Sequence, residues 1–176
     1  MSFNNLTRRG VLKTGAVAGA GLALPTIFTA QSVQAYTNEP TGGTVTFGFN
    51  VPQSGPYADE GADELRAYEL AVEHLNGGGD GGMMSTFSSK ALQGNGILGK
   101  KVEFVTGDTQ TKSDAARASA KSMIEKDNAV MITGGSSSGV AVAVQGLCQD
   151  AGVIFMAGLT HSNDTTGKDK KANGFR

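Results

Sequence analysis

The chain has 176 residues, a formal net charge of −1 and a single cysteine, Cys148. This length allows one domain, and the near-neutral charge offers no basic field for binding nucleic acid. A single thiol excludes a disulfide framework within these residues, a cysteine-based zinc cage and an iron–sulfur cluster. Because there are also only two histidines, we expect neither a metal site nor a cofactor.

The N-terminal residues have the features of an export signal. Arg8 and Arg9 precede an uncharged stretch rich in Gly and Ala, 15–30, and the following Val-Gln-Ala, which ends at Ala35, has the small-x-small form that a signal peptidase accepts. Paired arginines before a modest apolar region are typical of the twin-arginine route, and the stretch is short for a membrane span. We therefore predict that residues 1–35 are a twin-arginine signal peptide, recognised by that export machinery and cleaved at its end, and that the mature protein is periplasmic.

The mature part of the chain alternates predicted strands and helices. Strands are expected where β-branched and aromatic residues gather in short runs, and helices where apolar residues recur at intervals of three or four. The predicted strands cover 44–50, 101–106, 129–133 and 153–156, and the predicted helices cover about 58–75, 113–126 and 140–150. Ser113 is expected to cap the second helix and Gly152 to end the third. Strands this apolar are typical of a parallel sheet buried on both faces, so the order predicts a doubly wound α/β layer.

Two segments depart from this alternation. Residues 77–96 are rich in glycine and keep no apolar period, which favours a flexible surface insertion, with a lid or a partner contact as the alternative. Residues 173–176 stand where a fifth strand should start. We therefore expect the sequence to be a fragment cut at its C-terminus.

Three loops rich in Gly, Ser and Thr follow the first, third and fourth predicted strands, at 51–61, 134–139 and 158–162. In an open parallel sheet, ligands bind outside the carboxyl ends of the strands, where these loops should lie. Small residues let backbone N–H groups approach a ligand, and hydroxyls add donors and acceptors. The second loop leads into a helix, whose N-terminus suits a carboxylate. Alternatively, the loops are only tight turns, with Ser138 as a helix cap.

Several sequence stretches together give the chain a resemblance to a known family. They are Phe47-Gly48-Phe49 before Ser54-Gly55-Pro56, Gly61, residues 69–76, residues 96–103 with Asp108, residues 134–138 and residues 152–160. In their order and spacing the chain resembles the periplasmic leucine/isoleucine/valine-binding proteins, which have the type I periplasmic-binding fold. The resemblance implies a two-lobe solute-binding protein of an ABC importer. Residues 36–176 would then be its first lobe, incomplete and with the insertion 77–96, and the second lobe would be missing.

The resemblance also implies a ligand site and partners. The residues that it assigns to ligand binding are Ser137, Ser138, Gly158, Thr160, Tyr57 and Glu60. The two serines would hold a ligand carboxylate, the carbonyl near Gly158 and the Thr160 hydroxyl would meet an ammonium or amide group, and the loop from Tyr57 to Glu60 would line the wall. The ligand would be an amino acid, a short amide or urea, delivered to a permease in the inner membrane.

Two enzyme classes compete with this interpretation. Residues 135–139 fit G-x-S-x-G, the nucleophile elbow of α/β-hydrolases, which would make Ser137 a nucleophile. The base would be a histidine, but only His161 follows, and three consecutive serines fit a binding loop better than a strained elbow. A dinucleotide enzyme would need G-x-G-x-x-G after the first strand, where the chain has Pro52, which lacks an N–H. We therefore expect a binding protein and not an enzyme, with an exported hydrolase as the alternative.

Overall fold

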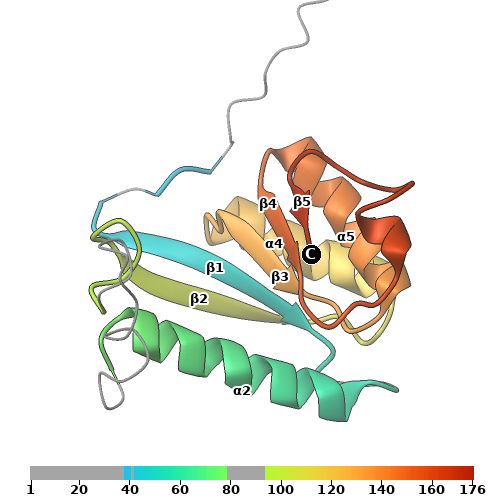
Figure 1. Cartoon of the computed structure of the whole chain (residues 1–176), viewed down its shortest axis with the longest axis horizontal. Helices are drawn as coiled ribbons and strands as arrows, with labels where there is room; N and C mark the ends of the chain where they lie inside the picture. Colours follow the sequence, from blue (N-terminus) through green and yellow to red (C-terminus); the bar gives the residue numbers. More distant parts are fainter. Residues whose placement is uncertain (1–37, 41, 79–93) are drawn as a thin grey trace, which may run out of the picture. The chain divides into compact units, whose positions relative to one another are not determined.

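The computed structural model describes residues 38–40, 42–78 and 94–176, which belong to one compact unit. Their elements, in chain order, are β1 (Thr44–Val51), α2 (Ala58–Leu75), β2 (Lys101–Asp108), α4 (Ser113–Lys126), β3 (Met131–Gly134), α5 (Ser138–Ala151), β4 (Ile154–Ala157), the 3-10 helix η1 (Asn163–Thr165) and β5 (Gly174–Phe175) (Figure 1). The predicted signal peptide and most of the Gly-rich insertion lie outside the described residues. In the part of the chain that is described, no helix has the length and apolar character needed to span a membrane.

All five strands pair in parallel, in the order β2-β1-β3-β4-β5. This confirms the predicted parallel α/β sheet, and β5 forms where a fifth strand was expected. The chain leaves β1 for β2 on one side and returns to β3 on the other, so the strand order reverses between β1 and β3. In open α/β sheets, ligands bind outside the carboxyl ends of the strands at such a switch point.

Helices lie on both faces of the sheet, as Figure 1 shows. On one face α2 packs on β1 and β2, and Val72 of α2 shares a buried cluster with Val45 and Phe49. On the other face α4 and α5 pack against each other and on β3 and β4. Gly48 of β1 points to this second face, where an added Cβ would meet the Met123 side chain. Successive residues of β1 therefore point to opposite faces of the sheet and contact both hydrophobic layers.

Burial on both faces, which was expected of the most apolar strands, is incomplete for β4, and β2 is mostly exposed. Val102 is the one buried residue of β2, because this strand lies at the sheet edge and pairs only with β1. In β4, buried side chains alternate with more exposed ones. Met156 is 38% exposed, and it lies beside Phe175 of β5, which is 49% exposed. The described helix on that face, α2, packs on β1 and β2 instead.

The helix ends correct the predicted cap at Ser113 and the alternative that made Ser138 a cap. Lys112, and not Ser113, is the N-cap residue of α4, and Ser113 begins the helix without a side-chain capping bond. Ser137, and not Ser138, is the N-cap residue of α5. At the other end of α5 the prediction is confirmed, because Gly152 has the left-handed conformation (φ 71°) that favours glycine.

Candidate ligand-binding site

The three Gly- and Ser-rich loops meet at the carboxyl edge of the sheet. They surround a hollow of about 170 Å³ that is lined by Tyr57, Glu60, Ser136, Leu159 and His161. Tyr57 and Glu60 were assigned to the site from the sequence, whereas Ser136 and Leu159 were not. The other assigned residues, Ser137, Ser138, Gly158 and Thr160, are chain neighbours of the lining residues but do not line this hollow themselves.

The first loop is fixed by Asp108, at the end of β2. One carboxylate oxygen, Oδ1, accepts the backbone N–H groups of Gln53 (2.9 Å), Ser54 (3.2 Å) and Gln110 (2.8 Å), and Oδ2 accepts the Ser54 hydroxyl (2.6 Å). Burial acts to raise the pKa of Asp108, but these hydrogen bonds, the Ser54 hydroxyl first, outweigh it and lower the pKa. An ionised Asp108 therefore holds the segment that leads to Tyr57.

A buried polar network lies under the hollow. Glu64 of α2 is only 5% exposed, and its two carboxylate oxygens accept the Tyr68 hydroxyl (2.6 Å) and the Ser136 hydroxyl (3.2 Å). The Thr133 hydroxyl donates to Tyr68 in turn (3.2 Å). Burial, followed by the nearby charge of Glu64, raises the pKa of Tyr68 well above its usual value, so the phenol stays a neutral donor. Gly158 packs directly on this network, because an added Cβ would overlap Glu64 and Tyr68.

The serine loop requires glycine at its start. Gly134 (φ 116°) and Gly135 (φ 81°) both have positive φ, and a Cβ on Gly134 would lie 2.5 Å from the carbonyl oxygen of Asn50. The loop then enters α5 at Ser137, whose side chain makes no capping hydrogen bond. The first N–H groups of any α-helix have no intrahelical partner, and here the N-cap side chain does not satisfy them either. The helix dipole favours an anion at this position.

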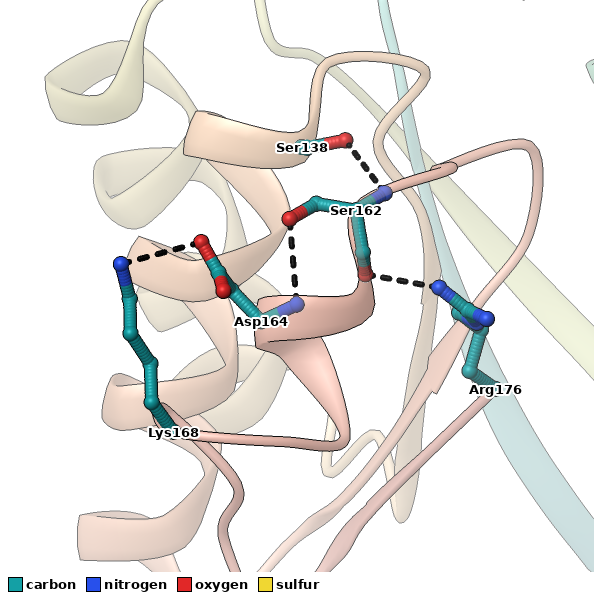
Figure 2. A network of polar contacts seen from close by, with 5 residues as sticks. All are labelled: Ser138, Ser162, Asp164, Lys168 and Arg176. Atoms are coloured by element: carbon teal, nitrogen blue, oxygen red, sulfur yellow. Dashed lines mark hydrogen bonds and ion pairs between the residues drawn. The ribbon is translucent and has the colours of Figure 1, made fainter.

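The third loop is tied to the serine loop, as Figure 2 shows. The Ser138 hydroxyl accepts the backbone N–H of Ser162 (3.2 Å), and the Ser162 carbonyl accepts from the Arg176 guanidinium (2.7 Å). Asp164 donates its N–H to the Ser162 hydroxyl (3.1 Å) and pairs with Lys168 (3.1 Å). The Ser138 side chain thus has a structural partner, although it is not a helix cap.

Thr160, in the same loop, is buried and polar. Its side chain is 4% exposed, and its hydroxyl has no hydrogen-bond partner among the described residues. A buried hydroxyl without a partner is costly, and Thr160 lies in the loop beside the hollow without lining it. Across the described residues, no group of three or more His, Cys, Asp or Glu side chains is placed to hold a metal ion.

Comparison with known proteins identifies the family. A model of the periplasmic binding protein family matches residues 44–176, from the first strand to the end of the chain. The chain belongs to this family. A model of the twin-arginine translocation signal sequence matches residues 5–25, which include Arg8 and Arg9. The predicted export signal is therefore confirmed, and the protein is exported to the periplasm.

Individual relatives agree with the family match. The chain is 32% identical over 116 residues to the Leu/Ile/Val-binding protein homolog 7 of Brucella abortus (strain 2308), an alignment that covers 66% of this chain and 25% of the relative. The chain thus spans about a quarter of the curated relatives that it matches. Among solved structures, an amino acid ABC transporter substrate-binding protein from Pseudomonas fluorescens Pf-5 is 26% identical, with a TM-score of 0.60 over 76% of this chain and 30% of that one.

Two more distant structures show the same fold. The branched-chain amino acid binding protein LivJ from Streptococcus pneumoniae, in complex with isoleucine, is 23% identical, with a TM-score of 0.59 over 72% of this chain and 32% of that one. A solute-binding protein from Rhodopseudomonas palustris BisB5, in complex with 3,4-dihydroxybenzoic acid, is 20% identical, with a TM-score of 0.60 over 76% and 32%. The expected type I periplasmic-binding fold is confirmed by these neighbours.

The hydrolase alternative is not supported. Among the described residues, no hydrogen bond joins Ser137 to either histidine, so the nucleophile and base of such an enzyme are not paired. The family that matches is one of binding proteins. Within the G-x-S-x-G pattern, Gly135 has the positive φ that favours glycine, and Ser137 is the N-cap residue of α5.

Proposed function

We propose that this chain is the ligand-binding first lobe of a periplasmic solute-binding protein of an ABC importer, and that residues 36–176 form this lobe once a signal peptide is removed after about Ala35. The whole protein would bind an amino acid or a short amide between two lobes and deliver it to a permease in the inner membrane. The twin-arginine export machinery would be its first partner. The observation that carries the proposal is the meeting of three hydroxyl-rich loops at the switch point of the sheet, beside the N-terminus of α5.

The proposed contacts follow from the chemistry of these loops. The N–H groups at the start of α5, with the hydroxyl of Ser137, would hold a ligand carboxylate. Ser138 would contribute chiefly its backbone N–H, because its hydroxyl already accepts from Ser162. The carbonyl of Gly158 and the hydroxyl of Thr160 would meet an ammonium or amide group. Isoleucine and 3,4-dihydroxybenzoic acid, the ligands of two structural neighbours, both carry a carboxylate, which supports an anion site at this helix.

The proposed role is binding without chemistry on the ligand. The buried Glu64 holds the serine loop by accepting the Ser136 hydroxyl and is itself bonded to Tyr68, and the proposed function needs no cofactor, metal or nucleic acid. In two-lobe binding proteins, closure about a hinge buries the ligand. The groups from the second lobe would complete the cleft.

Thr160 and Thr165 provide a matched test. Both are buried threonines whose hydroxyls have no partner among the described residues, but only Thr160 lies in a loop of the proposed site. In the full-length mature protein, Thr160→Val should keep the packing and remove a hydrogen bond to the ligand. A bond to a charged group contributes about 1.5–3 kcal/mol, so affinity should fall about 10- to 150-fold, whereas Thr165→Val should bind as the wild type does.

Calorimetric titration with a panel of amino acids, amides and dihydroxybenzoate gives the measurement, with melting curves to confirm that both variants are folded. Equal affinity of Thr160→Val and wild type would overturn the assignment of this site. Covalent labelling of Ser137 by a fluorophosphonate probe would overturn the binding function itself and restore the hydrolase.

A further inference from the structure

Four of the five residues that line the hollow between the three loops carry a polar group, although much of the wall is apolar. Of its five lining residues, only Leu159 has an aliphatic side chain, and the other four are Tyr57, Glu60, Ser136 and His161. Glu60 is exposed at the start of α2 and takes part in no ion pair with another described residue. Glu60 thus contributes a carboxylate to the lining of the hollow without an ionic partner among the described residues.

The direction of one hydrogen bond determines whether the Ser136 hydroxyl can donate to a ligand or only accept from it. The Ser136 hydroxyl donates to Oε2 of Glu64, and the other oxygen of Glu64 accepts from Tyr68. Because its single proton is used in this way, Ser136 can offer a ligand only its lone pairs. A carboxylate likewise only accepts. Glu60 and Ser136 thus present acceptors to the same hollow, with the buried Glu64 directly behind one of them.

The basic side chain that lines the hollow beside these acceptors is the imidazole of His161. None of the five lining residues is a lysine or an arginine. The cation bound to the third loop, Arg176, donates to the carbonyl oxygens of His161 and Ser162 and to Oδ1 of Asn163. Its N–H groups are thus directed at the loop itself. An aliphatic group placed in the hollow would strip water from Glu60 without replacing its hydrogen bonds, which is unfavourable.

We propose that this hollow selects the ligand, and that it takes a group with several N–H donors, such as a guanidinium, an ammonium or a primary amide. The inference rests on the proposed function and narrows it. The transported solute is then an amino acid or amide with a donor-bearing side chain, and not a branched-chain aliphatic amino acid. Glu60 is the specificity-determining residue, and Ser136, oriented by Glu64, is the second acceptor. His161 and Tyr57 complete the wall.

The test compares L-arginine, L-glutamine and L-leucine as probes of the full-length mature protein by calorimetric titration. The better of the two donor-bearing probes should bind at least about 10-fold more tightly than leucine, the scale of one charge-assisted hydrogen bond. Glu60→Leu should remove this preference by weakening the donor-bearing probe about 10- to 150-fold and improving leucine. Asp59→Asn is the matched control, because Asp59 is an exposed acid of the same helical turn that does not line the hollow.

The outcomes separate the two proposals. Leucine binding more tightly than both other probes to the wild type would overturn this inference and leave the transport function standing. An unchanged preference in Glu60→Leu would also overturn it, because Glu60 would then not be the selecting group. If none of the probes, nor any other amino acid or amide, binds the wild-type protein, the proposed function fails and the inference fails with it.

Discussion

The side-chain amide of Asn76 forms two hydrogen bonds with the backbone of Val102, donating to its carbonyl oxygen and accepting from its N–H, both at 2.8 Å. Asn76 is the residue that ends α2, and Val102 is the buried residue of the edge strand β2. Both backbone groups of Val102 point away from β1, where β2 has no neighbouring strand. The amide of Asn76 therefore takes the place of a strand partner at this position and attaches the end of α2 to the sheet.

Asn76→Asp tests this attachment. The carboxylate cannot donate, so it leaves the Val102 carbonyl without a partner and places a negative charge beside it. We expect the free energy of unfolding to fall by about 1–3 kcal/mol, the cost of an unsatisfied buried group. Urea denaturation gives the measurement, and Asn95→Asp, at an exposed asparagine, should be nearly neutral. Equal stability of both variants would contradict the role of Asn76.

The sequence predicts the elements well because their signals are local. Apolar runs and helical spacing locate the helices and strands to within about two residues. The end of β2 is different, because the prediction stops at Thr106 before a glycine that breaks strands by local rules. Gly107 nevertheless continues the strand opposite Asn50, and an added Cβ would overlap Met123 of α4. That contact joins residues far apart in the chain, so no local pattern contains it.

The candidate site likewise has some features that follow from the sequence alone and others that depend on contacts between distant segments. Tyr57 and Glu60, which the family resemblance assigned to the pocket wall, both line the hollow, and their contact with a ligand stays a prediction. The serine loop was found, but not the serine that lines the hollow. Ser136, Ser137 and Ser138 are alike in sequence, and only the position of Glu64 under the loop distinguishes Ser136. The partner of Ser138, the N–H of Ser162, likewise depends on how two separate loops come together.

Asp108→Asn should loosen the first loop in a pH-dependent way. The pKa of Asp108 is lowered in the folded protein, so its contribution to stability is present above the unfolded pKa of about 3.9 and is lost as the pH falls through the lower folded value. The carboxylate lies near the surface, so we expect about 1 kcal/mol at neutral pH. Urea denaturation of the wild type and the variant should give curves that differ at pH 7 and converge toward pH 3. A difference that is independent of pH would mean that the ionised carboxylate is not what holds the loop.

Gly158→Ala should disrupt the network under the site. The new Cβ would overlap Glu64 and Tyr68, so a side chain or the loop must move, at a cost of about 1–3 kcal/mol for overpacking. Gly146→Ala is the matched control, because Gly146 lies within α5 with nothing within 4 Å of an added Cβ. That change should stabilise the helix by about 0.5–1 kcal/mol. Thermal melting of the two variants should therefore shift in opposite directions, and a neutral Gly158→Ala would argue against the packing of Gly158 on the network.

Cys148 should be chemically silent in the folded protein. Its side chain is fully buried between α5, α4 and the sheet, and burial raises the pKa of the thiol to about 12. The thiolate is the reactive form, and a free thiol with a pKa of about 8.5 becomes mostly ionised between pH 7 and pH 9. For Cys148 the ionised fraction stays small throughout that range, so iodoacetamide labelling of the native protein should be slow and should rise little with pH. In urea above the unfolding midpoint, labelling should reach the rate of a free thiol. Mass spectrometry of the peptide that contains Cys148 measures both rates, and native labelling as fast as that of the unfolded chain would mean that α5 does not pack on the sheet as described.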